Sequence, residues 1–174
     1  MINISKQQLR DKLWLPELGR FAYYVDPTGI PRLDGMYQTL IYPVIWDNIL
    51  DPLDSYTSIR HLRDRLTGVG GEIYLTNHFS NHATETFPTW GMQAGASQQP
   101  WGAWGLAAVG LRNETYRPLK AVSEWVMSDF HQGAWPEVAH ERRIGYFSPP
   151  AGVFVQAVIE ALFGLNVNKP AGVL

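Results

Sequence analysis

The stretch Thr89–Gly105 combines residue types that suit the binding of a neutral, hydroxyl-rich ligand. It contains three tryptophans, four glycines and three glutamines, and none of its side chains is charged. Flat aromatic faces alternate with neutral amides that both donate and accept hydrogen bonds, a combination that fits a sugar ring. The other interpretation is a glycine-punctuated turn that leads into a tightly packed helix, with the tryptophans in the core. The predicted substrate-binding residues of this stretch are Trp90, Gln93, Gln98, Gln99 and Trp101.

Two histidines just upstream raise the question of a metal site. His78 and His82 have the i, i+4 spacing of helical metal ligands, and Glu85 follows them. The neighbouring sequence Phe-Ser-Asn and the later Thr-Phe-Pro favour a loop, in which this spacing loses its meaning. We therefore expect no metal and no other cofactor, and we assign His78 to hydrogen bonds with sugar hydroxyls. The alternative hypothesis is a helical enzyme that uses His78, His82 and Glu85 with a metal.

Composition limits the classes of function. At 174 residues and 45% hydrophobic residues, the chain fits one domain, residues 1–174, with a core of ordinary size. A net charge of −2 gives no basic surface for nucleic acid or an anionic membrane. No cysteine is present, and no apolar run approaches the ~20 residues that span a bilayer. Because the first residues do not resemble a secretory signal, we expect a soluble protein, cytoplasmic by default.

The elements that must position these side chains are mostly helices. Apolar residues recur at helical spacing in several segments, and glycine or proline ends most of them. Pro43 weakens or kinks the second segment, and Asp54 or Ser55 is expected to cap the third. The last segment is apolar nearly all round and is therefore expected to be buried. The pattern predicts four or five helices in antiparallel pairs, drawn from residues 6–15, 35–50, 55–66, 100–109, 117–129 and 151–163.

Between the helices, the sequence predicts short strand pieces and long loops. Phe21, Tyr23 and Val25 alternate before an Asp-Pro-Thr-Gly turn, which indicates a short extended segment. A second short strand is expected at Glu72–Leu75. Long irregular stretches, which in a compact domain are often functional, cover residues 76–99 and 133–150. The predicted fold class is all-α, with antiparallel helical hairpins, long loops and short strand pieces.

Three places in the chain carry a resemblance to a known architecture. They are Leu13-Trp14 with Gly19–Tyr23, the loop that enters a helix at Gln99–Trp101, and Gly133–Glu137 with the Gly-Tyr-Phe-Ser-Pro sequence and apolar helix that follow. Together they resemble the six-hairpin (α/α)6-toroid glycoside hydrolases, the architecture of glucoamylases and trehalases. The resemblance spans roughly residues 13–167. A full toroid needs a much longer chain, so this one resembles the C-terminal half of such a domain.

The resemblance implies catalysis by a pair of carboxylates, as glycoside hydrolysis normally requires. In such toroids the loop before the last inner helix often presents a catalytic carboxylate, and Glu137 occupies that loop. Trp135-Pro136 before it stiffens the backbone and places an aromatic wall beside the carboxylate, so Glu137 is the expected general base. Asp47 is the expected second carboxylate, with Asp51 as an alternative. Each also fits an ordinary role, as an exposed loop glutamate or a helix-capping aspartate.

Two hypotheses of function follow from these residues. The first is a glycoside hydrolase that binds an oligosaccharide in a pocket walled by Trp90, Trp101 and Trp135. The second is a non-catalytic sugar-binding or structural half-toroid that a partner completes. In either case, inner helices at the open edges would expose apolar surface, which favours association. We therefore expect a homo-oligomer or pairing with a complementary half-domain.

Overall fold

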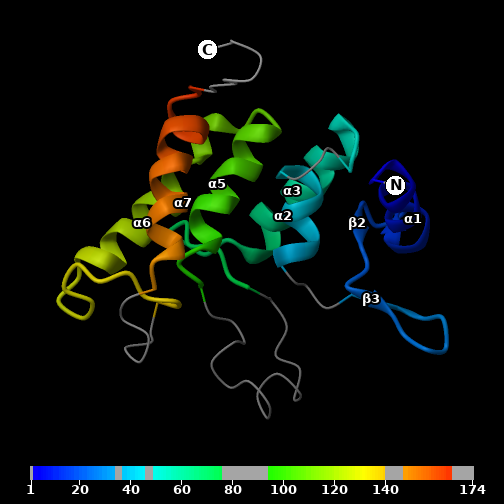
Figure 1. Cartoon of the computed structure of the whole chain (residues 1–174), viewed down its shortest axis with the longest axis horizontal. Coiled ribbons are helices and arrows are strands. Elements are labelled where there is room, and N and C mark those ends of the chain that lie inside the picture. The colour runs from blue at the N-terminus through cyan, green and yellow to red at the C-terminus, as the bar shows by residue number, and fades with distance from the viewer. Residues whose placement is uncertain (1, 34–36, 46–48, 76–93, 140–146, 166–174) are drawn as a thin grey trace. The chain divides into compact units, whose positions relative to one another are not determined.

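The computed structural model describes residues 2–33, 37–45, 49–75, 94–139 and 147–165 (Figure 1). Helices make up most of this described part, and the only strands in it are two-residue pieces. The expectation of a mostly helical fold is thus confirmed. The chain divides into two compact units: the first comprises residues 1–67 and 74–93, and the second comprises residues 68–73 and 94–174.

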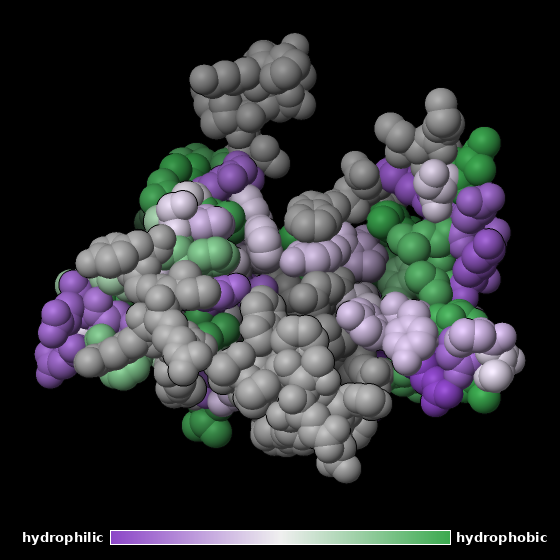
Figure 2. Space-filling view, turned by 60° about the horizontal axis from the view of Figure 1, so that its bottom comes forward, coloured by the Kyte–Doolittle hydropathy of each residue, from purple (hydrophilic) through white to green (hydrophobic). Residues whose placement is uncertain are grey.

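The first unit is built on a pair of packed helices. Ile41, Ile59 and Leu62 are almost completely buried in it, and the Ser58 hydroxyl donates a hydrogen bond of 2.9 Å to the carbonyl of Leu40. Over the N-terminal part of the chain, at the right of the view, Figure 2 shows strongly hydrophilic surface beside apolar surface. The helices of this unit are α1 (Ile2–Leu13), α2 (Tyr37–Ile45) and α3 (Pro52–Leu66).

The cap of α3 is Asp51, three or four residues before the predicted caps Asp54 and Ser55. Asp51, in an extended backbone conformation, accepts a hydrogen bond of 2.9 Å from the Asp54 amide, and Pro52 occupies the first helical position. Both features are typical helix starts. Arg10 of α1 reaches the same helix end, at 3.2 Å from Asp51 and 2.6 Å from Asp54. The Asp54 amide, with help from Arg10, lowers the pKa of the Asp51 carboxyl.

Two small antiparallel hairpins link α1 to α2, and the single extended segment predicted at residues 21–25 is divided between them. In the first, Trp14 pairs with Phe21, and their rings meet edge to face at 5.1 Å. In the second, Tyr24 pairs with Arg32 around the predicted Asp-Pro-Thr-Gly turn, where Gly29 adopts a φ of +83°. The strands are β1 (Trp14–Leu15), β2 (Arg20–Phe21), β3 (Tyr24–Val25) and β4 (Pro31–Arg32).

The first hairpin packs on α3 through its turn. Gly19 adopts a φ of +61°, and a Cβ atom there would lie 2.3 Å from the Thr57 methyl carbon, so only glycine fits without displacement. Next to it, His61 Nε2 lies 2.7 Å from the carbonyl oxygen of Leu18. Partial burial lowers the pKa of His61, and neighbouring arginines act in the same direction.

The second unit is a cluster of three helices packed through small residues. Ala103, Leu119, Ala157 and Ala161 form its buried core, and Trp104 packs against them. Small side chains let the helix axes approach closely, as the Gly- and Ala-rich sequence of residues 102–108 predicted. The elements are α5 (Gln98–Ala108), η1 (Arg112–Glu114), α6 (Tyr116–Met127) and α7 (Pro149–Ala157), which a π-helical turn, η2 (Val158–Leu162), continues.

A completely buried glutamine holds the start of α5. The Gln99 amide nitrogen donates to the carbonyls of Ile73 and Gly95, both at 2.8 Å, and its oxygen accepts from the Ile73 amide at 2.7 Å. Gly102, one turn on, lies against Ile73, because a Cβ there would come within 2.0 Å of the isoleucine Cδ1. The Gln99 side chain therefore holds Ile73 against α5. The strand predicted at residues 72–75 is not among the strands in the described part of the chain. The helix also starts two residues before Pro100, which still lies in its first turn.

The prediction that the last helix is buried all round is wrong. Val155 is 58% exposed, Ile159 43% and Phe163 69%, although Ala157 and Ala161 are buried. The exposed residues are spaced by four and share one side of α7 and η2. One face thus packs on α5, and the other carries apolar side chains into solvent. In the described part of the chain, no helix has the length and apolarity needed to cross a membrane.

The lowered pKa of His61 makes the stability of the first unit depend on pH. The unfolded chain takes up a proton near pH 6.5, whereas folded His61 takes it up only at lower pH. The stabilising contribution is therefore complete above about pH 6.5 and is lost as pH falls below it. We expect the free energy of unfolding to fall between pH 7.5 and 5.5 less in His61→Gln than in the wild type, measured by urea denaturation with circular dichroism. Parallel curves for the two proteins would contradict this assignment.

The buried Gln99 amide predicts a large effect of a single truncation. Gln99→Ala leaves both main-chain groups of Ile73 without their partner, at a cost of roughly 1–3 kcal/mol per buried group, so we expect a loss of about 2–6 kcal/mol in the free energy of unfolding. Gln98→Ala is the matched control, because Gln98 is only partly buried. Denaturant titration of the full chain measures both. Equal losses in the two variants would show that the Gln99 amide has no special role.

Candidate functional site

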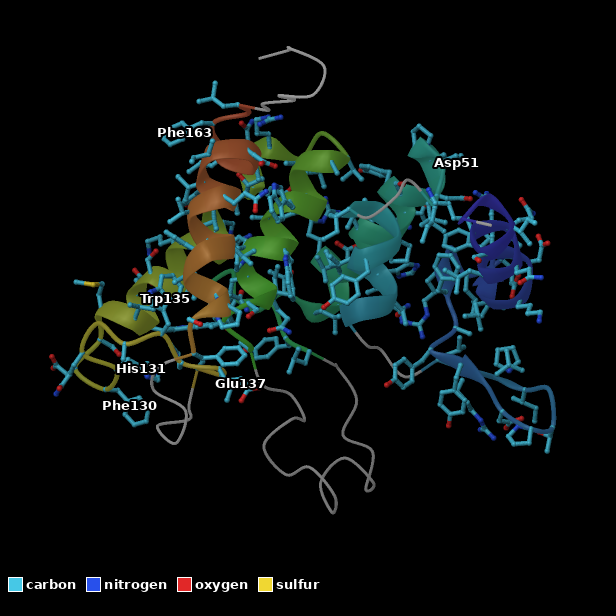
Figure 3. The ribbon with its side chains drawn as sticks, in the orientation of Figure 1. Asp51, Phe130, His131, Trp135, Glu137 and Phe163 are labelled. Atoms are coloured by element: carbon cyan, nitrogen blue, oxygen red, sulfur yellow. The ribbon has the colours of Figure 1, made fainter. Side chains whose placement is uncertain are left out.

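The candidate site lies at the end of the second unit where α5 and α7 begin and α6 ends. Figure 3 places Phe130, His131, Trp135 and Glu137 at this end and Phe163 at the opposite one. All four site residues belong to the segment between α6 and α7. The expected catalytic loop therefore does run across one end of a helix cluster.

Main-chain hydrogen bonds hold this loop against the segment that leads into α5. The amide of Ala96 donates to the Glu137 carbonyl at 2.8 Å, and the amide of Ala139 donates to the Ala94 carbonyl at 2.9 Å. Gly95 and Val138 form an antiparallel bridge between these two bonds. The sequence singled out these two stretches separately, and the structure brings them side by side.

A tight turn at the end of α6 directs the loop back toward α5. Gln132 and Gly133 adopt positive φ values of 54° and 88°, and the Gly133 amide donates to the Val126 carbonyl at 2.7 Å. His131 is buried, and its Nε2 lies 2.8 Å from the carbonyl oxygen of Ala139. The histidine thus closes the loop by tying its beginning to its end.

Trp135 forms a fixed aromatic wall in this loop. Its ring packs on Phe154 of α7 at a centroid distance of 5.3 Å and an interplanar angle of 54°. Its carbonyl accepts a hydrogen bond of 2.8 Å from the Phe147 amide. The tryptophan remains partly exposed, so part of its surface is available to a ligand.

Glu137 is anchored through its backbone while its side chain stays unused by the described residues. The residue is partly buried, and its carbonyl receives the Ala96 amide. No residue in the described ranges donates a hydrogen bond to its carboxylate or forms an ion pair with it. Such a carboxylate can accept a proton, or a hydrogen bond from a ligand hydroxyl, without first breaking a bond to a described residue.

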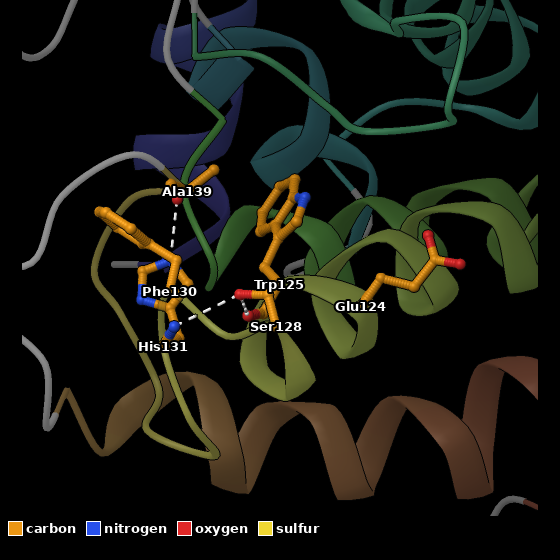
Figure 4. Close-up of a pocket in the computed structure, with 6 residues that line it drawn as sticks. All are labelled: Glu124, Trp125, Ser128, Phe130, His131 and Ala139. Atoms are coloured by element: carbon orange, nitrogen blue, oxygen red, sulfur yellow. Dashed lines mark hydrogen bonds between the residues drawn. The ribbon is translucent and has the colours of Figure 1, made fainter.

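A cavity of about 400 Å³ opens beside the same loop (Figure 4). Trp125 and Phe130 supply its aromatic lining, and its polar groups are already engaged. Glu124 pairs with Lys120 at 2.6 Å, which raises the pKa of the lysine, and the Ser128 hydroxyl donates to the Trp125 carbonyl at 2.6 Å. The cavity therefore offers mainly apolar contact.

No role at the site was predicted from the sequence for three residues of this region, Trp125, Phe130 and His131. Trp125 is a partly buried wall of the cavity. Phe130 and His131 were not singled out. They follow the end of α6, where the helical spacing that marks core residues stops. The only available signal was an aromatic-histidine pair placed just before a Gln-Gly turn.

The other predicted binding residues separate into two groups. Gln99 is buried with its amide bonded to the backbone, so it supports the site without facing a ligand. Gln98 folds over Gly95, and Trp101 is partly buried in the first turn of α5. Asp51 caps α3 in the first unit, the ordinary role weighed for it. The remaining predicted residues lie outside the described ranges: Asp47, His78, Trp90 and Gln93.

The metal hypothesis also falls outside the part of the chain that the structure describes, because His78, His82 and Glu85 all lie there. Among the described residues, no three histidine, aspartate or glutamate side chains come close enough to hold a metal ion.

Comparison with known proteins gives a likeness in structure only. No protein-family model matches the chain, and no curated protein sequence matches it. Among solved structures, it is similar to the neutral trehalase Nth1 from Saccharomyces cerevisiae, with a TM-score of 0.67 and 14% sequence identity. The match covers 97% of this chain and 30% of the trehalase chain. The chain therefore has a mostly helical fold like that of part of a trehalase, and it spans less than a third of that protein's length.

Proposed function

We propose that this chain is part of a glycoside hydrolase and that Glu137 is one of its catalytic carboxylates. The observation that carries the proposal is the unused, partly buried carboxylate of Glu137 on a loop anchored at the end of a trehalase-like helix cluster. A loop held by main-chain bonds fixes the position of a side chain, and a carboxylate that no described residue engages is ready to react.

The proposed chemistry is acid–base hydrolysis of a glycosidic bond. Glu137 acts as general base and takes a proton from the attacking water, while a second carboxyl group protonates the leaving oxygen. Asp47 is the candidate for that second role. The two groups would lie ~6.5–9.5 Å apart in an inverting enzyme and ~5–5.5 Å apart in a retaining one, where the base is replaced by a nucleophile.

The proposed ligand is an oligosaccharide that stacks on aromatic side chains. The exposed part of Trp135, two residues before Glu137 in the same loop, suits the apolar face of a sugar ring. Trp90 and Trp101 are the further proposed walls, and Gln93, Gln98 and His78 the proposed hydrogen-bonding residues. A neutral set of this kind suits hydroxyl groups, because amides and imidazoles both donate and accept hydrogen bonds.

A second candidate function is a non-catalytic sugar-binding or structural half-domain. The share of the trehalase chain that the match covers, 30%, favours it, because catalysis in such a fold could depend on residues from the rest of the domain. In this reading Trp135 and its neighbours bind the sugar, and Glu137 supplies hydrogen bonds to hydroxyl groups.

We also propose that the chain associates with a second copy of itself through α7 and η2. The exposed residues Val155, Ile159 and Phe163 form an apolar stripe along these elements. Contiguous apolar surface of this kind tends to be covered by a partner. Such pairing would supply the neighbouring helices that a half-toroid lacks.

Substitution at Glu137 separates catalysis from binding. Glu137→Gln removes the base and keeps the shape and a hydrogen-bonding group, so we expect turnover of trehalose or aryl glucosides to fall roughly 10²–10⁴-fold with the sugar affinity retained. Glu160→Gln is the control, since Glu160 is equally partly buried but lies toward the far end of the α7–η2 helix. Unchanged turnover in Glu137→Gln would contradict the catalytic role. Sugar binding without turnover by the wild type would support the half-domain.

Charge placed on the apolar stripe tests the proposed self-association. The double substitution Val155→Glu and Phe163→Glu introduces repulsion and desolvation at the contact, so we expect the sedimentation coefficient to shift from that of a dimer to that of a monomer. Val69→Glu is the matched control, because Val69 is 99% exposed in the same unit and outside the stripe. A wild-type chain that sediments as a monomer at all concentrations would refute this contact.

A further inference from the structure

A groove of about 630 Å³ lies in the first unit, between α1 and the hairpin that carries β3. One side of the helix lines it at positions 5, 8, 9, 12 and 13, which share a face at helical spacing. Residues 23–25 of the hairpin form the opposite wall. Figure 1 shows α1 and β3 in this part of the molecule. The groove belongs to the first unit alone and contains no residue of the Glu137 site.

The two walls of the groove are joined at its base. The amide of Ala22 donates a hydrogen bond of 2.8 Å to the carbonyl of Leu13, the last residue of α1. The Trp14–Phe21 ring pair lies directly beside this bond. The residues that precede Tyr23 are therefore fixed to the end of the helix. The separation of the walls is set by bonded structure, so the groove is formed before a ligand arrives.

Two exposed tyrosines form the aromatic wall. Tyr23 is 45% exposed and Tyr24 is 46% exposed, and their rings meet edge to face at 5.7 Å with an interplanar angle of 73°. Because the rings are nearly perpendicular, they present aromatic surface in two directions. Large exposed aromatic side chains beside a groove are typical of ligand-binding sites.

The hairpin that carries these tyrosines is stiffened by Asp26. One oxygen of its carboxylate accepts bonds from the Thr28 amide and hydroxyl and from the Ile30 amide, at 2.6–3.0 Å. Its other oxygen pairs with the Arg32 guanidinium on the facing strand. Together these bonds hold the pKa of Asp26 well below its usual range, and the bond from the Thr28 hydroxyl has the largest effect. The carboxylate is thus charged at neutral pH, and the tyrosines stand on a fixed support.

The helix wall offers polar groups that no described residue uses. The Gln8 amide and the Lys12 ammonium line the groove, and neither forms a hydrogen bond or ion pair within the described ranges. Leu9 and Leu13, both partly buried, line the same groove. No carboxylate lines the groove. The result is an apolar floor and an aromatic wall that face an unengaged amide and a single cation.

We propose that this groove is a second saccharide-binding site, separate from the site at Glu137. A pyranose ring has one apolar face, which suits Tyr24, and a rim of hydroxyl groups, which suits an amide that donates and accepts and an ammonium that donates. A purely apolar peptide would bury Gln8 and Lys12 without partners, which is costly. The lone cation also favours a ring that carries a carboxylate over a neutral ring of the same shape.

The proposal depends on the chemistry of the groove and not on catalysis at Glu137. A non-catalytic chain could still hold a sugar here, and a hydrolase could lack this second site. The two proposals fail in different measurements, because Glu137→Gln changes turnover and leaves this groove intact. Substitutions in the groove change binding and leave turnover of a small substrate intact.

Saturation-transfer NMR on the full chain tests the groove, with maltotriose, xylotriose and glucuronate as probes at about 10 mM, well above a Kd of ~1 mM. We expect binding of at least one probe. Tyr24→Ala should weaken it roughly tenfold by loss of the ring, whereas Tyr24→Phe should retain it. Gln8→Ala should also weaken it, and Lys12→Ala should weaken glucuronate more than the neutral sugars. Tyr116→Ala is the control, since Tyr116 is 53% exposed in the other unit.

Two results would overturn the proposal. The first is the absence of any sugar signal from the wild-type chain at these concentrations. The second is a signal that Tyr24→Ala and Gln8→Ala leave unchanged, which would place the sugar elsewhere, and loss of that signal in Trp135→Ala would then assign it to the Glu137 site. Both groove substitutions change exposed side chains, so circular dichroism is expected to confirm that the variants fold.

Discussion

The buried amide of Gln99 is the interaction on which the second unit depends. It satisfies both main-chain groups of Ile73 and the carbonyl of Gly95, at a position with no solvent to replace them. Gly95 is the residue that bridges to Val138, so the same amide indirectly positions the loop of Glu137. A neutral side chain with both a donor and an acceptor is needed here. A carboxylate or an ammonium could supply only one of them.

Local signals in the sequence were read correctly because they act over a few residues. The Asp-Pro-Thr-Gly turn encodes its own geometry through the Asp26 carboxylate, which bonds to residues two and four positions on. Asp51 before Pro52 caps a helix for the same reason, although the cap was predicted three or four residues later, at Asp54 or Ser55. The prediction of a mostly helical fold rests on spacing of this kind, and it was confirmed.

Long-range relations were the part that the sequence did not reveal. A glutamine in a Trp- and Gln-rich stretch fits a ligand site and a buried backbone contact equally well. Only its partner 26 residues away decides between them. The last helix was expected to be buried because its composition is apolar, but burial depends on how many neighbours surround it. His131 was missed because its partner, the Ala139 carbonyl, belongs to a loop without periodicity.

The carboxylates of this chain differ in what their oxygens are bonded to, and this difference is more informative than their sequence context. Asp26 and Asp51 follow turn and cap patterns, and their oxygens are occupied by main-chain amides and arginines. Glu137 has the opposite arrangement, since its backbone is bonded and its carboxylate is not engaged by the described residues. Stability alone gives no reason for a partly buried carboxylate that no described residue engages, because desolvation without a partner is unfavourable. A ligand that bonds to it would remove that penalty, which is the physical argument for the proposed role of Glu137.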